Sequence, residues 1–117
     1  MRNPRNFTTP LTIERPVQGS LDAFGDPEQA RGYQVAGERW GLVVDLRGKE
    51  LEVAMSRDTE VQVKVVLYTD SMTSQIKNDW IITNRQTGEA FSPLYTLKED
   101  TERGLCISVF AKRAEAR

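Results

Sequence analysis

The chain lacks the residue type that most often carries proton-transfer chemistry. Its 117 residues include no histidine, and histidine is both the commonest general base and the commonest metal ligand. A Ser–His–Asp site, a Cys–His site and a histidine zinc site are therefore impossible within this chain. Cys106 is the only cysteine, so no internal disulfide is expected and a reduced, cytoplasmic setting is natural.

The remaining chemistry-bearing residues form none of the common ligand motifs. The sequence contains no phosphate-binding G-x-x-x-x-G-K-[S/T], no dinucleotide-binding G-x-G-x-x-G and no calcium loop of the D-x-D-x-D-G type. Catalysis by carboxylates alone stays formally open. We therefore predict a protein that is not an enzyme, with no catalytic residues, no cofactor and no metal site.

Composition and charge narrow the class of protein. A net charge of −1 gives no electrostatic footprint for wrapping nucleic acid or docking on an anionic membrane. No apolar run approaches the ~20 residues needed to cross a bilayer, and the first 20 residues do not resemble a secretory signal. We expect one β domain over residues 11–113, preceded by an N-terminal arm (1–10) and followed by a short tail (114–117).

Alternation of apolar and polar residues predicts six strands. They cover residues 11–17, 38–46, 59–69, 80–84, 91–97 and 105–110. Residues 47–58 fit either a short amphipathic helix or a strand after a bend, and we favour one or two helical turns. The pattern predicts an all-β fold, either a small sandwich or a partly open barrel, with at most one short helix.

The same alternation predicts the core. The large residues of the second strand share one face, and we expect Trp40 to anchor the core there because a buried indole removes about 150–250 Å² from water. The predicted core residues are Trp40, Leu42, Val44, Val63, Val65 and Ile107.

The stretch 18–36 has no sustained period and is punctuated by glycine, proline and aspartate, which predicts a long loop. Loops of this length in compact domains are usually functional or disordered. One hypothesis is that neighbouring subunits order it through the contact residues Asp22, Phe24, Gly25, Asp26 and Tyr33. The alternative is a flexible surface excursion, with Phe24 tucked back on the core and Asp22 forming only a local turn.

Several segments, taken in order, resemble one known family. They are LTIERP (11–16), DAFGDP (22–27), ERWGLVVDLRGKE (38–50), VQVKVVLY (61–68) and LCISVFAKR (105–113). They resemble features of the phage head–tail adaptor, or head-closure (stopper), family. These features are an opening strand, a D-x-x-G turn, a W-A-x-[I/V] strand followed by a G-x-E step, and a final strand with a basic end. Gly41 replaces the usual alanine, and the region 90–98 is stretched relative to the family pattern.

The resemblance implies a structural subunit of the virion neck, made in the host cytoplasm. Copies of such a subunit form a ring between the portal, or an adaptor ring, above and the tail terminator or tail tube below. DNA passes through the ring without sequence-specific binding, and some members close the channel after packaging and reopen it at ejection. Two other interpretations stay open: a tail-completion or tail-terminator-like minor tail protein, and a small β-barrel module that binds a peptide or nucleic acid.

Overall fold

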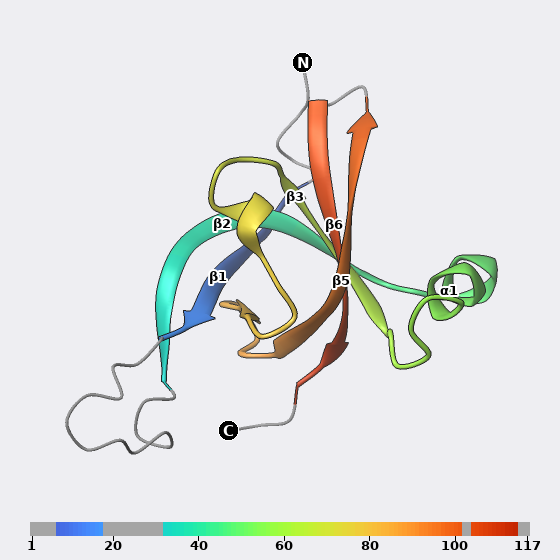
Figure 1. Cartoon of the computed structure of the whole chain (residues 1–117), viewed down its shortest axis with the longest axis horizontal. Helices are drawn as coiled ribbons and strands as arrows, with labels where there is room; N and C mark the ends of the chain where they lie inside the picture. The colour runs from blue at the N-terminus through green and yellow to red at the C-terminus, as the bar shows by residue number, and fades with distance from the viewer. Residues whose placement is uncertain (1–6, 18–31, 102–103, 115–117) are drawn as a thin grey trace.

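The computed structural model describes residues 7–17, 32–101 and 104–114. Six antiparallel strands close into a barrel in the order β1-β2-β3-β6-β5-β4 (Figure 1). The strands are β1 (Thr9–Pro16), β2 (Tyr33–Asp45), β3 (Val63–Tyr68), β4 (Ile81–Asn84), β5 (Ala90–Thr101) and β6 (Gly104–Arg113). The helix α1 (Gly48–Met55) joins β2 to β3, and the 3-10 turn η2 (Thr73–Gln75) lies between β3 and β4. The predicted all-β fold with one short α-helix is confirmed, and the barrel is closed.

The short strand β4 closes the barrel. It pairs with β1 from Ile81↔Glu14 to Asn84↔Leu11 but reaches β5 only at Phe91 and Ala90. The seam between β4 and β5 is therefore the least extensively paired part of the wall. Beyond it, β5 is paired with β6 alone.

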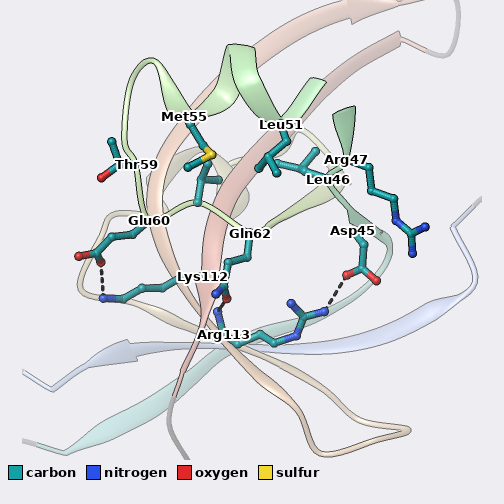
Figure 2. A pocket seen from close by; sticks show the side chains of 11 residues that line it. Asp45, Leu46, Arg47, Leu51, Met55, Thr59, Glu60, Gln62, Lys112 and Arg113 are labelled. Carbon is teal, nitrogen blue, oxygen red and sulfur yellow. Dashed lines mark hydrogen bonds and ion pairs between the residues drawn. The ribbon is translucent and has the colours of Figure 1, made fainter. Parts of the chain in front are cut away.

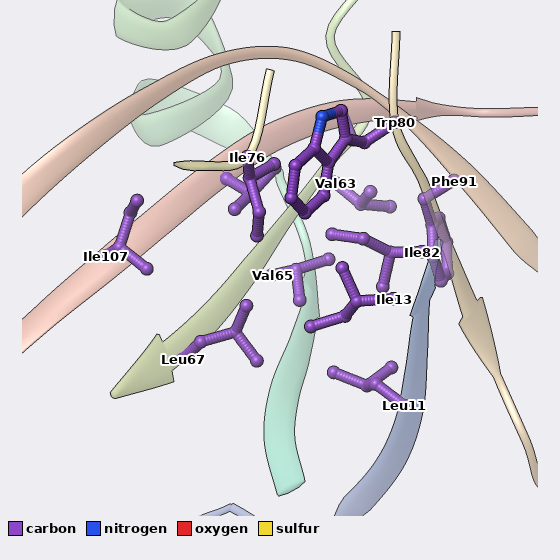
Figure 3. Packing of buried hydrophobic residues seen from close by; sticks show 12 residues of the cluster. Leu11, Ile13, Val63, Val65, Leu67, Ile76, Trp80, Ile82, Phe91 and Ile107 are labelled. Atoms are coloured by element: carbon purple, nitrogen blue, oxygen red, sulfur yellow. The ribbon is translucent and has the colours of Figure 1, made fainter. Parts of the chain in front are cut away.

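The inside of the barrel is a single apolar cluster to which five of the six strands contribute (Figure 3). Strand β3 shows the period of two most clearly, with Val63, Val65 and Leu67 fully buried and the residues between them half-buried. The buried members of the cluster are Leu11, Ile13, Val63, Val65, Leu67, Ile76, Trp80, Ile82, Phe91, Ile107, Val109 and Ala111.

A second apolar cluster lies outside the barrel, beneath α1. Its buried members are Leu46, Ala54, Val61 and Phe110. The ring of Tyr95 stacks on Phe110 with centroids 4.8 Å apart, and the Tyr95 hydroxyl donates a hydrogen bond to the Ala54 carbonyl at 3.0 Å. Strand β6 is thus covered on both faces, by the barrel interior on one side and by this cluster on the other.

The predicted orientation of β2 is wrong. The side chain of Trp40 is 60% exposed, and Leu42 and Val44 are only half-buried, whereas Val43 packs against the inner cluster. The indole in the core is Trp80, which is 6% exposed. Residues 42–44 are all apolar, so their pattern does not distinguish the two faces, and the prediction placed the larger side chains inside.

Gly41 explains why Trp40 faces outward. A Cβ atom on Gly41 would lie 2.7 Å from Cδ1 of Leu11, 2.8 Å from Cδ2 of Leu67 and 2.8 Å from the Val66 carbonyl oxygen. Normal carbon contacts are about 3.5–4.0 Å. The interior at this position has no room for a side chain, so the inward position in β2 is a glycine and the indole beside it points away from the barrel.

The start of β2 also differs from the prediction. The strand begins at Tyr33, whereas the loop was expected to extend to residue 36. The β1–β2 pairing shifts between Ile13 and Glu14, which pair with Gly37 and Val35 and leave Ala36 as an extra residue. Such a bulge interrupts the period of two, and this interruption hid the first part of the strand.

The favoured helix within residues 47–58 is confirmed as α1. It starts at Gly48, whose φ of +57° lies in the left-handed region that glycine adopts without strain. Glu50, in the first helical turn, accepts a hydrogen bond from Lys64 of β3 at 2.7 Å. This ion pair ties the helix to the barrel wall.

Candidate interaction surface

The outward-facing residues of β2 form an apolar row on the barrel surface. Trp40, Leu42 and Val44 alternate along the strand, so their side chains point to the same face. On the neighbouring strands Pro10 pairs with Trp40 and Val66 with Leu42. We call these five residues the Trp40 row.

The Trp40 row has the composition of a protein contact surface. Single exposed apolar side chains are normal on protein surfaces, but here an exposed indole is continuous with half-buried aliphatic side chains. Tryptophan is among the residues most enriched in the energetically dominant positions of protein interfaces. The row therefore offers a rigid anchor, on a strand, for a binding partner.

A hollow of about 670 Å³ lies beside α1, which we call the α1 hollow (Figure 2). Its apolar lining comes from Leu46 and Val61 next to the barrel, from Leu51 and from Met55. The polar lining residues are Asp45, Arg47, Thr59, Glu60, Gln62, Lys112 and Arg113. The sequence pattern showed no sign of this hollow, because the residues that form it come from the end of β2, from α1, from the stretch before β3 and from the end of β6.

Ion pairs neutralise most charges on the rim of the α1 hollow. Arg113 donates to Glu89 at 2.6 Å and to Asp45 at 2.7 Å, and these hydrogen bonds raise the pKa of its guanidinium above the usual value. Lys112 donates to Glu60 at 2.7 Å. Arg47 is exposed and pairs with no carboxylate in the part of the chain that the structure describes. Its guanidinium is therefore the uncompensated charge of the rim.

A half-buried turn after β3 contacts β2 through Arg39. Asp70 accepts a hydrogen bond from Nε of Arg39 at 2.9 Å and further bonds from the backbone N–H groups of Met72 and Thr73. Partial burial opposes ionisation of Asp70, but these hydrogen bonds outweigh it and hold its pKa below the usual value. The ion pair fixes the turn against the strand that carries Trp40.

Two hairpins continue past the closed part of the wall. In the first, β1 and β2 pair as far as Pro16↔Tyr33, and the N–H of Val17 donates to the carbonyl of Gly32 at 2.9 Å. In the second, β5 and β6 pair as far as Thr101↔Gly104. Each hairpin carries exposed large apolar residues: Val17, Tyr33 and Val35 on the first and Leu105 on the second.

The structure places one of the five predicted contact residues. Tyr33 is in β2 and not in a loop, with its side chain 41% exposed. Asp22, Phe24, Gly25 and Asp26 lie outside the described residues. The predicted core residues Val63, Val65 and Ile107 are buried in the inner cluster.

No protein-family model and no curated protein matches the chain. Among the described residues, no helix is long and apolar enough to cross a membrane. Within the same residues, no group of three or more His, Cys, Asp or Glu side chains is placed to hold a metal ion.

Proposed function

We propose that this chain is a non-enzymatic structural subunit of a tailed-phage neck. In this proposal it is a head–tail adaptor or head-closure protein that forms a ring below the portal, lines or closes the DNA channel and joins the tail. The observation that carries the proposal is the Trp40 row, because a barrel with its own complete core gains nothing from an outward tryptophan unless something covers it. The order of sequence segments that resembles the adaptor family supplies the particular class.

The positions of the β1–β2 hairpin and of α1 support the same function. A ring subunit needs side surfaces that meet different surfaces of its neighbours around a closed rotation. The β1–β2 hairpin and α1 lie on opposite sides of the barrel (Figure 1). The subunit therefore offers separate contact elements in two directions.

The net charge of −1 fits a subunit that surrounds DNA without gripping it. Tight binding to a duplex requires many Lys and Arg contacts to phosphates. Phage DNA is expected to slide past such a ring during packaging and ejection. The proposed partners are therefore other copies of the chain, the portal or adaptor ring above, and the tail terminator or tail tube below.

Electron microscopy of virions and purified necks tests this proposal. A tag at the C-terminus of the chain, labelled with gold-conjugated antibody, should mark a ring between head and tail. Particles assembled without the chain should contain heads that lose DNA or fail to join tails. Complete and infectious particles without the chain would refute the function. Label on isolated tails and not on DNA-filled heads would favour the tail-completion or tail-terminator-like alternative.

A second candidate function follows from the α1 hollow. An apolar floor with a polar rim is the usual form of a binding site, which fits a small β-barrel module for a peptide or nucleic acid. A salt-dependent shift of DNA in a gel at physiological ionic strength would favour this candidate. If the chain does not shift DNA in the gel and is found as a ring in the neck, nucleic acid is excluded as the ligand of the α1 hollow.

A further inference from the structure

We propose that the Trp40 side chain of one copy occupies the α1 hollow of the next copy, and that this contact repeats head to tail. The inference rests on the proposed ring function and names the surfaces that join neighbouring subunits. Both halves of the contact belong to the same chain, and the second copy is therefore the occupant to which we assign the hollow.

The chain cannot fill its own hollow. Trp40 and Asp45, which lies at the edge of the hollow, are five residues apart on the same strand. A strand rises about 3.3 Å per residue, so the two positions are about 16 Å apart along β2. Because β2 is held by β1 over its first part and by β3 over its last part, the strand does not fold back on itself.

The chemistry of the two surfaces matches. The hollow presents Leu51 and the thioether of Met55, a flexible side chain that adapts to irregular shapes and makes favourable contacts with aromatic rings. A buried indole removes about 150–250 Å² from water. Complete burial of the Trp40 indole in the hollow would therefore provide the kind of central residue that contributes most of the binding energy of an interface.

Charge complementarity favours a second copy over an unrelated partner. Glu38 is two residues from Trp40 and points to the same outer face. Its ion pair with Arg85 is 3.5 Å long, against 2.6–2.9 Å for the other ion pairs among the described residues. Glu38 is thus a loosely held anion beside the indole, and Arg47 is the rim cation that pairs with no carboxylate of the described residues.

The spacing of the two pairs also agrees. Glu38 and Trp40 are separated by about 6.6 Å, two steps along a strand. Arg47 is the residue just before α1, and the Leu51 N–H donates to its carbonyl across the first turn of the helix, so the two residues are neighbours at the start of α1. When the indole contacts Leu51, the Glu38 carboxylate therefore lies within reach of the Arg47 guanidinium.

Cysteine cross-linking tests the contact in a Cys106→Ala background, which contains no other cysteine. The variant with both Thr12→Cys, on the outer face beside Glu38, and Thr59→Cys, on the rim of the hollow, keeps Trp40 and Met55. With the chain at millimolar concentration, a short bismaleimide should convert it into a ladder of trimers and larger species. Each single-cysteine variant should stay monomeric. A dimer without larger species from the double variant would show a two-fold contact and overturn the head-to-tail arrangement. The absence of any cross-link would overturn the contact altogether.

Fluorescence quenching tests the native tryptophan. The chain has two indoles; Trp40 is 60% exposed and Trp80 is 6% exposed, so acrylamide quenching reports mainly on Trp40. Quenching should fall several-fold as the concentration of the chain rises. Leu105→Ala, which changes a similarly exposed apolar residue on the other hairpin, should leave that transition unchanged. Quenching that does not depend on concentration would contradict the inference.

A charge exchange tests the predicted pair. Glu38→Arg or Arg47→Glu alone should weaken association about tenfold, at the low end for a close interfacial charge pair, and the double exchange should restore it. No recovery would refute the Glu38–Arg47 contact. All these experiments leave the proposed function separately testable, because a ring in the neck without a Trp40 contact would refute only this inference.

Discussion

Substitution of Gly41 by alanine is the sharpest test of how β2 sits in the barrel. The added Cβ would approach two buried leucine methyl groups and the Val66 carbonyl oxygen to 2.7–2.8 Å, about 1 Å closer than an ordinary contact. The methyl groups belong to fully buried side chains and the oxygen to the backbone, so none of them moves freely. Overpacking of this kind costs about 1–3 kcal/mol. Replacing glycine also reduces the conformational entropy of the unfolded chain, which stabilises the folded state by only about 0.4–1 kcal/mol.

The net expectation for Gly41→Ala is a loss of about 1–2 kcal/mol in the free energy of unfolding. With a urea m-value of about 1–3 kcal/mol per molar, the midpoint should fall by roughly 1 M. Gly37→Ala is the matched control on the same strand. Its nearest contact is Cε of Met72 at 2.8 Å, the end of a flexible side chain that can move, so it should cost less than about 0.5 kcal/mol. Equal midpoints for the two variants would refute this account of the orientation of β2.

Three further predictions follow from individual contacts. Trp80→Ala should lower the free energy of unfolding by about 3–5 kcal/mol, because it truncates a buried aromatic side chain. Trp40→Ala should lower it by less than about 1 kcal/mol in dilute protein, because the Trp40 indole is exposed. Urea melts of the two variants test this, and equal losses would place Trp40 in the core. The folded state lowers the pKa of Asp70 from its usual value of 3.8. The stability that the ionised carboxylate contributes is therefore fully present above pH 3.8, and it is lost as the pH falls through the lower pKa of the folded state. The stability difference between wild type and Asp70→Asn should therefore shrink in acid melts below that pH, and a difference that grows there would contradict the assignment. Tyr95→Phe keeps the stacking on Phe110 but removes the hydrogen bond to the Ala54 carbonyl. Thermal or urea melts should therefore show a free energy of unfolding lower by about 0.5–1.5 kcal/mol. An unchanged midpoint would mean that water replaces this hydrogen bond without cost.

The fold class could be predicted because most strands carry a clear period of two. In β3 the buried and half-buried positions alternate without interruption, as the sequence indicated. The closure of the barrel could not be predicted, since it depends on the four-residue strand β4 pairing with β1, and the paired residues are 67 to 73 positions apart in the sequence. A local pattern contains no information about such a distant partner.

The Trp40 row was not predicted. Trp40, Leu42 and Val44 were expected in the core, and this expectation failed because apolar residues occupy both faces of β2 between Leu42 and Val44. Gly41 was the available signal, since a glycine inside a strand often marks a close approach of other chain segments. The α1 hollow left no comparable signal, because it forms only when the end of β2, α1, the stretch before β3 and the end of β6 come together.

Closure of the barrel also decides how copies of this chain can join. Strand addition uses the free end strands of an open sheet, and the pairing of β1 with β4 joins the strands that would otherwise form those ends. Association must then rely mainly on side chains that project from the strand faces and from the hairpins. A tryptophan held on a strand by pairing on both sides is already ordered before it binds, so little further conformational entropy is lost. In the proposed ring, the outward position of Trp40 would therefore be the feature through which a closed barrel with its own core joins the next copy.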